Sequence, residues 1–345
     1  MIKKILHYII SVAKRNKLVQ SIFEQPIEVS KLSPKGIFTD KYGQSYTLFG
    51  GLRSKIKPGW EKYFSDNYKT INFSDSYINS LINNAKITVE RISPLIETYL
   101  GDLKGKKILE IGCNSGAVTY TLAQKDISGI TGSDFSSYKV NSMNKNQTDL
   151  LEVNTVLKEL RNNIKSKFIK TEIVTFVDDD ICNTRLPKNS YDLICSWDVL
   201  EHVSNPKEAI TNIRDLLTEN GIAIHDYNPF FSLGGGHSAC TIDFPWGHVL
   251  LDQDDFIRYN EQVQPEKKEA SVSFFKNGLN RMTIKNFIDI CNELNINILS
   301  LITFPKEQHV RMMTSQILKT AQRNYPTLTL NDLVSPRIIV VFKKS

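Results

Sequence analysis

The chain has 345 residues, of which 41% are hydrophobic and 23% charged, a composition typical of a folded globular protein and unlike that of a disordered chain. Its 43 Lys and Arg residues against 37 Asp and Glu residues give a net charge of +6 without an arginine-rich stripe. This argues against a dedicated nucleic-acid binder and suits an acidic substrate such as a phosphorylated or nucleotide-linked sugar. The five cysteines show no C-x-x-C spacing, so we expect reduced thiols in a cytoplasmic protein.

Residues 1–17 place apolar side chains at helical spacing, with lysines and an arginine between them. This pattern predicts a basic amphipathic helix, which either lies on a membrane surface or packs on the rest of the protein. The apolar part is too short to cross a bilayer and no cleavage site follows it, so we expect neither a signal peptide nor an anchor. Peripheral contact with the inner membrane surface is therefore the membrane hypothesis for this chain.

Residues 30–70 are rich in turn-forming Gly and Pro residues with tyrosines between them, which predicts short strands and turns. A helical pattern follows over residues 76–99. We expect residues 1–74 to form an N-terminal extension and substrate cap, and residues 75–345 to form the main domain. Insertions are expected in that domain at about 226–282 and 305–336.

The segment Lys107 to Gly116, KILEIGCNSG, is a short apolar run followed by a turn with two glycines. The apolar run predicts a buried parallel strand, and Gly112 and Gly116 allow a tight turn before a helix. The amide groups at the start of such a helix bind a ligand readily. The segment therefore predicts the first half of a βαβ unit with a nucleotide-type loop.

The spacing within this loop separates two classes of cofactor. A dinucleotide fingerprint has Gly at its third position, where this chain has Asn114, which leaves less room for a pyrophosphate. The form E-x-G-x-x-x-G, from Glu110 through Gly112 to Gly116, resembles motif I of class I S-adenosylmethionine (SAM) methyltransferases, which often have a cysteine at the position of Cys113. A Rossmann-type NAD(P)-dependent oxidoreductase or epimerase, and a non-catalytic SAM-binding protein, are the alternatives.

Three later segments match the same family at the separations it requires. An apolar run ends at Asp134, and the resemblance implies that this carboxylate accepts hydrogen bonds from the ribose hydroxyls beside Phe135. The run over residues 172–183 ends in three aspartates, of which Asp180 fits the adenine amino group, with Ile181 on the ring and Asp179 as the fallback. Residues 190–224 follow the family order of strand, D-x-L-E-H, amphipathic helix and strand. We add Ser196 and Trp197, at the end of that strand, to the cofactor-binding residues.

Residues 136–168 exceed the length of one crossover helix, so we expect an enlarged second crossover of unknown role. A helix is expected over residues 283–294, strands over 296–304 and 337–343, and a helical excursion over 305–336. The resemblance implies a Rossmann-like α/β fold: a doubly wound, seven-stranded mixed sheet whose last strand is antiparallel.

Residues 225–259 combine a run of three glycines with aromatic residues and two histidines, and we expect them to select the acceptor. A hydroxyl acceptor needs a general base, and His202, His248 and His237 are the candidates. Asp198, Glu201 and His202 are spaced to share one helical face and would suit a divalent ion together with His237 or His248, but we favour no metal. The expected activity is SAM-dependent O-methylation of a small-molecule or glycan-related acceptor; a metal-assisted or quinone and lipid O-methyltransferase is the alternative within the family.

Overall fold

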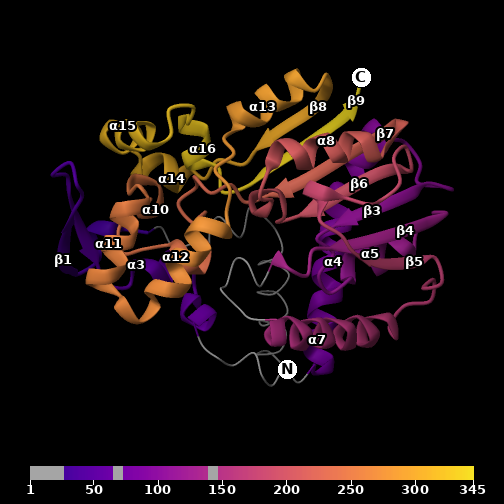
Figure 1. The fold of residues 1–345 in the computed structure, drawn as a ribbon, viewed down its shortest axis with the longest axis horizontal. Helices are drawn as coiled ribbons and strands as arrows, with labels where there is room; N and C mark the ends of the chain where they lie inside the picture. Colours follow the sequence, from indigo (N-terminus) through magenta and orange to yellow (C-terminus); the bar gives the residue numbers. More distant parts are fainter. Residues whose placement is uncertain (1–26, 65–72, 139–146) are drawn as a thin grey trace, which may run out of the picture.

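The computed structural model describes residues 27–64, 73–138 and 147–345, so the amphipathic helix predicted over residues 1–17 lies outside the described residues. Figure 1 shows two groups of elements side by side, a sheet with helices on both faces and a lobe made mainly of helices. No helix among the described residues is long and apolar enough to cross a membrane.

The sheet has seven strands in the order β5-β4-β3-β6-β7-β9-β8. The strands β3 to β7 pair in parallel, whereas β9 pairs antiparallel with both of its neighbours. The prediction of a doubly wound mixed sheet with an antiparallel last strand is therefore confirmed. The strand bounds are β3 Lys107–Ile111, β4 Gly129–Asp134, β5 Val174–Asp178, β6 Tyr191–Trp197, β7 Leu217–Tyr227, β8 Ile296–Thr303 and β9 Ile338–Lys344.

Alternation along the strands explains why both faces of the sheet are covered. In β3, Ile108 packs into the core below α4 (Asp75–Tyr99) and α5 (Ala117–Ala123), while Leu109 packs into the core below α8 (Pro206–Leu216) and α13 (Ile284–Glu293). In β9, Val341 and Val340 divide in the same way. Successive strand side chains point to opposite faces, so a continuous apolar run indicates a strand buried on both sides.

The enlarged second crossover contains one long helix, α7 (Gln147–Lys165). Its C-terminal half packs beside α4 and α5, where Leu160 and Ile164 are buried with Tyr120. Helix α7 therefore lies next to the elements that follow the glycine turn, which gives this insertion a place near the predicted cofactor loop.

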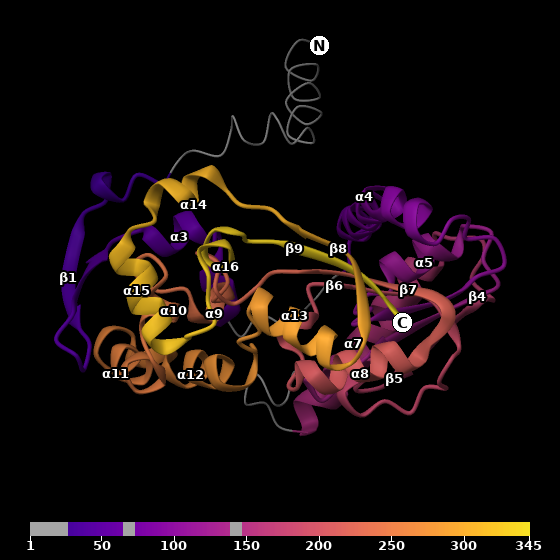
Figure 2. The same ribbon diagram turned by 90° about the horizontal axis from the view of Figure 1, so that it is seen from above.

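The second group of elements, which we call the cap lobe, combines segments from three parts of the chain. Residues 34–64 supply a hairpin and short helices, residues 237–277 supply four α-helices and the 3-10 helix η6 (Pro265–Lys267), and residues 307–334 supply three α-helices. Figure 2 shows these segments together on one side of the molecule. One apolar core joins them, and Trp246 at its centre is fully buried and donates its indole N–H to the carbonyl oxygen of Leu333. The predicted short strands over 30–70 and the helical excursion over 305–336 are confirmed. The elements are β1 (Pro34–Thr39), β2 (Ser45–Phe49), α3 (Leu52–Ile56), η2 (Trp60–Phe64), α9 (His237–Cys240), α10 (Gly247–Leu250), α11 (Gln253–Val263), α12 (Lys268–Asn277), α14 (Glu307–Met312), α15 (Ser315–Asn324) and α16 (Leu330–Val334).

Candidate active site

A cavity of about 430 Å³, here called the donor cavity, lies where β3, β4, β5 and β6 end. The strand order reverses between β3 and β6, the place where open α/β sheets bind their ligands. The cavity is lined by Ile111, Gly112, Asn114, Asp134, Phe135, Tyr138, Asp179, Asp180, Ile181, Asp198, Val199, His202, Val203, Ser204 and Asn277.

The turn after β3 depends on glycine at two positions. Gly112 and Gly116 both have a positive φ, and a Cβ atom at either would collide with a neighbour, Val199 or Phe176. Asn114 between them also has a positive φ of 42°, a conformation that few residues other than Gly adopt easily. The backbone of this turn is therefore held in a specific shape by its neighbours.

Asp134 ends β4 at the cavity wall, and its carboxylate is held from the other side by Arg161 of α7. The guanidinium lies 3.2 Å from Asp134 Oδ2, and its Nε donates to the carbonyl oxygen of Asn114 at 2.7 Å. It also lies over the ring of Phe176, 4.6 Å from the centroid. One side chain of the crossover insertion thus joins the turn after β3 to the acid that ends β4.

The three aspartates after β5 have different partners. Asp178 accepts hydrogen bonds from Ser136, and Asp179 accepts from Thr184 Oγ1 and from the backbone N–H of Arg185. Asp180 accepts from the backbone N–H of Cys182 at 2.9 Å, and its second oxygen has no hydrogen-bond partner among the described residues. Of the three, Asp180 is therefore the one whose carboxylate keeps an oxygen available beside the donor cavity.

Several predicted cofactor residues do not line the donor cavity and instead lie in the structure below or beside it. The carboxyl of Glu110 is buried and accepts from Thr119 Oγ1, and burial raises its pKa to about 8. The thiol of Cys113 is buried, which raises its pKa, and Ser196 Oγ lies 2.7 Å from Nδ1 of the buried His225. Trp197 and Gly116 also lie outside the lining. The role of these residues in binding cofactor stays a prediction.

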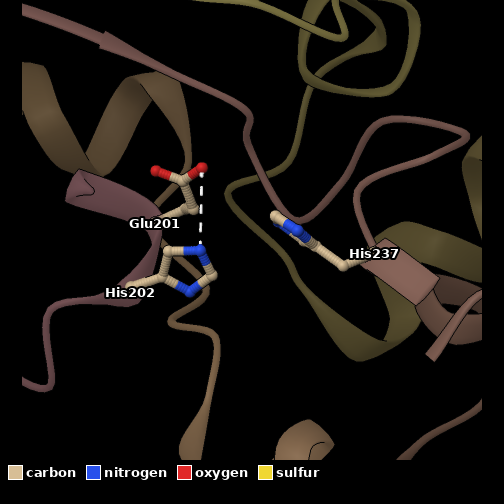
Figure 3. Close-up of side chains that lie close together, drawn as sticks. All are labelled: Glu201, His202 and His237. Carbon is tan, nitrogen blue, oxygen red and sulfur yellow. Dashed lines mark ion pairs between the residues drawn. The ribbon is translucent and has the colours of Figure 1, made fainter. Parts of the chain in front are cut away.

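A second feature, here called the histidine cluster, consists of Glu201, His202 and His237 (Figure 3). One ligand atom from each residue lies within 4.8 Å of the others. Glu201 and His202 belong to a three-residue 3-10 helix, η5 (Leu200–His202), whereas His237 begins α9 in the cap lobe. The cluster therefore forms where the sheet and the cap lobe meet.

The expected helical face of Asp198, Glu201 and His202 is wrong. Asp198 has a positive φ of 54° and precedes η5 rather than joining a helix with it. Asn280 explains the short helix, because its side-chain amide donates to the carbonyl oxygens of Leu200 and Val203, and its backbone N–H donates to that of Glu201. Asp198 instead accepts from the side-chain amide of Asn228.

Hydrogen bonds determine which nitrogen of His202 is available. Nδ1 lies 2.6 Å from the carbonyl oxygen of Gly278, which can only accept, so Nδ1 carries the proton. Tyr138 Oη lies 2.8 Å from the same nitrogen. The Nε2 lone pair is therefore free to accept a proton or to bind a cation, as in histidines whose other nitrogen donates to a backbone carbonyl.

Two atoms of the histidine cluster, Glu201 Oε2 and His237 Nε2, are buried without a hydrogen-bond partner among the residues that the structure describes. Such atoms are rare in folded proteins, because each carries an uncompensated desolvation cost. Burial raises the pKa of Glu201, with a smaller contribution from Asp198, and burial lowers the pKa of both histidines. The cluster thus offers a carboxyl oxygen and an imidazole nitrogen, both without partners among the described residues, to a hydroxyl group or a divalent cation.

Comparison with known proteins decides the family, because the family model described as "Methyltransferase domain" matches residues 85–301. This chain belongs to the methyltransferase-domain family. A ubiquinone biosynthesis O-methyltransferase of Rickettsia typhi is 25% identical over 138 residues, which are 40% of this chain and 47% of that protein. The protein of the same name from Rickettsia prowazekii is 25% identical over 230 residues, 62% of this chain and 81% of that protein. The chain spans about half the length of most of the curated relatives it matches.

Among solved structures, a putative S-adenosylmethionine dependent methyltransferase from Listeria monocytogenes aligns with 73% of this chain and 97% of that chain, at 12% identity and a TM-score of 0.43. The family match and the seven-stranded sheet together make this a SAM-dependent methyltransferase domain of the class I type.

The donor cavity of this methyltransferase domain fits SAM. The cofactor carries positive charge on its sulfonium and amino groups, and the carboxylates of Asp134, Asp180 and Asp198 border the cavity without a Lys or Arg among the described lining residues. Ile111, Ile181 and Val203 add apolar surface for the adenosine rings. Asp134 would hold the ribose hydroxyls, and Asp180 with Ile181 would hold the adenine.

The three histidines predicted as candidate bases lie in two different places in the structure. His202 lines the donor cavity and contacts His237, with ring centroids 5.0 Å apart. His248 is 1% exposed, its Nε2 lies 2.9 Å from the carbonyl oxygen of Phe230, and burial lowers its pKa to about 4. His248 thus belongs to the core of the cap lobe, whereas His202 and His237 face one another.

Sequence reasoning missed Tyr138, Arg161, Asn228, Gly278 and Asn280, which shape the donor cavity and the histidine cluster. Tyr138 and Gly278 fix the tautomer of His202, and Asn228 and Asn280 hold the loop after β6. These residues come from segments far apart in the chain, and no local pattern marks them. Arg161 alone lies in a segment that the sequence marks as unusual, because the second crossover is longer than one helix requires.

Proposed function

We propose that this methyltransferase domain transfers the methyl group of SAM to a hydroxyl oxygen of a small-molecule or glycan-related acceptor, with the histidine cluster receiving the hydroxyl. The observation that carries the proposal is the set of unpaired acceptor atoms in the cluster. Glu201 Oε2 and His237 Nε2 are buried beside His202 without partners in the described part of the chain, and His202 lines the donor cavity. Neighbouring hydroxyl groups of an acceptor placed there would give these two atoms a partner, while the hydroxyl that is methylated donates to His202 Nε2.

The curated relatives support oxygen as the acceptor atom. Both Rickettsia proteins described above are named ubiquinone biosynthesis O-methyltransferases. The common part of the name, O-methylation, agrees with a cluster that can remove a proton from a hydroxyl group. The acceptor molecule of this chain is a separate question, because the residues of the cap lobe would select it.

The protein contributes position and a proton acceptor to this reaction. When bound, SAM supplies a methyl group on a good leaving group, so alignment of the acceptor oxygen provides most of the catalysis. The Nε2 lone pair of His202 accepts the proton of the hydroxyl, while Gly278 and Tyr138 hold the ring in place through Nδ1. Glu201 Oε2, which has no partner among the described residues, pairs with a neighbouring hydroxyl group of the acceptor and so helps to orient the molecule.

A metal-assisted form of the same reaction is the second candidate, and the 4.8 Å grouping of carboxylate and imidazole atoms favours it. Glu201, His202 and His237 would hold a divalent cation, which would lower the pKa of an acceptor hydroxyl. Asp198, whose own pKa is raised by burial and by Asp226, would add negative charge next to that cation.

Labelled SAM tests the proposal directly. The purified full chain is incubated with methyl-labelled SAM and fractions of small hydroxyl compounds, and the labelled product is identified by mass spectrometry and NMR. We expect one added methyl group on oxygen. Label on nitrogen or carbon, or tighter binding of NAD than of S-adenosylhomocysteine in a fluorescence titration, would contradict the proposal.

A variant and a chelator then separate the two candidate forms. We expect His202→Gln to lower turnover by roughly 100-fold or more, the usual contribution of a general base, with unchanged affinity for S-adenosylhomocysteine. If a chelator abolishes turnover of the unmodified protein and added Mg²⁺ restores it, the metal-assisted form is correct. If the chelator has no effect, His202 acts alone as the base.

A further inference from the structure

A second cavity, of about 500 Å³, lies between the sheet and the cap lobe, and we call it the basic cavity. Three distant segments supply its walls: the end of α3, the loop after β7 and the start of α14. Its basic lining residues are Lys55, Lys57, Lys306 and His309, and no Asp or Glu lines it among the residues that the structure describes. Asn228, Ser232 and Gln308 add neutral hydrogen-bonding groups.

Lys57 is the central cation of the basic cavity. Its side chain is mostly buried and runs along Gly234, where a Cβ atom would lie 3.2 Å from Lys57 Cε and 3.7 Å from Nζ. No hydrogen bond or ion pair joins this ammonium group to another described residue. Burial lowers the pKa of Lys57, while the more distant charges of Asp198 and Glu201 raise it. A desolvated ammonium without a direct partner is costly unless a ligand pairs with it.

Asn228 connects the basic cavity to the reaction site. It lines the basic cavity, its side chain donates to Asp198 at the border of the donor cavity, and its backbone N–H donates to Glu201 Oε1 at 3.2 Å. The charge of Lys57 also lowers the pKa of His237 in the histidine cluster. A molecule in the basic cavity would therefore contact a residue, Asn228, that is hydrogen-bonded directly to Asp198 and to Glu201 of the histidine cluster.

We propose that the basic cavity binds a phosphate group of the methyl acceptor, so that the acceptor is a phosphorylated hydroxyl compound. This inference rests on the proposed function, because it places the phosphate of the same acceptor whose hydroxyl group binds at the histidine cluster. Several ammonium groups as point charges suit a multiply charged phosphate, whereas a single carboxylate is more often matched by the fork of an arginine. Lys57 and Lys306 pair with the phosphate oxygens, and Asn228 and Ser232 donate neutral hydrogen bonds to them.

Calorimetric titration tests this assignment without knowledge of the whole acceptor. Pyrophosphate is titrated into the full chain saturated with S-adenosylhomocysteine, for the unmodified protein and for Lys57→Gln/Lys306→Gln. The matched control is Lys207→Gln/Lys285→Gln, which removes the same charge from lysines that pair with Glu293 and Asp289 outside the cavity. We expect the first variant to bind pyrophosphate at least about tenfold more weakly, and the control to bind it like the unmodified protein.

Three results would overturn the inference. The first is an equal loss of pyrophosphate affinity in both double variants. The second is acetate that competes with pyrophosphate as well as inorganic phosphate does. The third is a loss of S-adenosylhomocysteine affinity in Lys57→Gln/Lys306→Gln as large as its loss of pyrophosphate affinity. The last result would mean that the lysines hold the donor instead. If that variant does not fold, as judged by its circular dichroism spectrum and its thermal unfolding, Lys306→Gln alone is measured in the same way. Pyrophosphate binding with no O-methylated product in the labelled-SAM assay would refute the proposed function and leave this site standing.

Discussion

The two cavities of this methyltransferase domain are lined by side chains of opposite charge, and they are built from different kinds of segments. The donor cavity is bordered by aspartates and lies at the ends of four neighbouring strands, whereas the basic cavity is bordered by lysines from two segments that are far apart in the chain. SAM, the methyl donor, carries positive charge on its sulfonium and amino groups, whereas the acceptor that we propose carries a negatively charged phosphate. Opposite charges in adjacent cavities would keep each molecule in its own site and bring the methyl and the hydroxyl together between them.

The largest expected effect concerns Glu110, which lies buried in β3 below the acidic donor cavity. Its folded pKa of about 8 lies above the ordinary value of 4.5, so the folded protein keeps a proton that the unfolded chain releases. Stability from this group is complete below pH 4.5 and is lost as the pH rises towards 8. Between pH 5 and pH 7 we expect the free energy of unfolding to fall by about 2 to 3 kcal/mol relative to Glu110→Gln, which does not titrate.

Urea unfolding of both proteins at the two pH values measures this difference. Parallel pH profiles for the unmodified protein and Glu110→Gln would show that Glu110 is ionised in the folded state. The negative charge below the donor cavity would then be larger than its lining aspartates provide, and the contrast between the two cavities would extend into the sheet.

The next effect concerns Asp134, the acid predicted to hold the ribose. We expect Asp134→Ala to weaken SAM binding by roughly 1 to 3 kcal/mol, the usual loss when hydrogen bonds to a charged group are removed. Asp178→Ala is the matched control, because it removes the same charge at the end of the neighbouring strand from a carboxylate bonded to Ser136. Titration with S-adenosylhomocysteine measures both variants. Unchanged affinity in Asp134→Ala would remove this residue from the donor site.

The contrast between the cavities also explains what the sequence could predict. The strands, the glycine turn, Asp134 and Asp180 follow from local patterns, because parallel strands bring their carboxyl ends to one edge of a sheet. The helical face expected at Asp198, Glu201 and His202 failed because Asn280, far along the chain, binds the carbonyl groups that a longer helix would have used. Lys57 follows a short helix in a turn-rich segment, and only tertiary packing against Gly234 places it beside Asn228.

The smallest effect concerns Arg161, which places a positive charge next to Asp134 at the border of the donor cavity. Its guanidinium contacts the Asn114 carbonyl, the Asp134 carboxylate and the ring of Phe176 at once, so it fixes the turn after β3 relative to the end of β4. We expect Arg161→Ala to weaken binding of S-adenosylhomocysteine by up to about 1 kcal/mol, because partly exposed ion pairs contribute little and the remaining loss comes from a looser turn. Lys170→Ala, which removes an exposed lysine that follows the same helix and donates to the carbonyl oxygen of Lys125, is the control and should bind like the unmodified protein.

Arg161→Lys shows which part of the Arg161 side chain matters. A lysine keeps the charge, but its single ammonium cannot donate to Asn114 and pair with Asp134 in the fixed geometry of a guanidinium. We therefore expect its affinity for S-adenosylhomocysteine to lie closer to that of Arg161→Ala than to that of the unmodified protein. If Arg161→Lys binds as well as the unmodified protein, Arg161 acts only by offsetting the charge of Asp134. If Arg161→Ala binds more tightly, Arg161 competes with the ribose for the Asp134 carboxylate, and their ion pair must weaken when the cofactor binds.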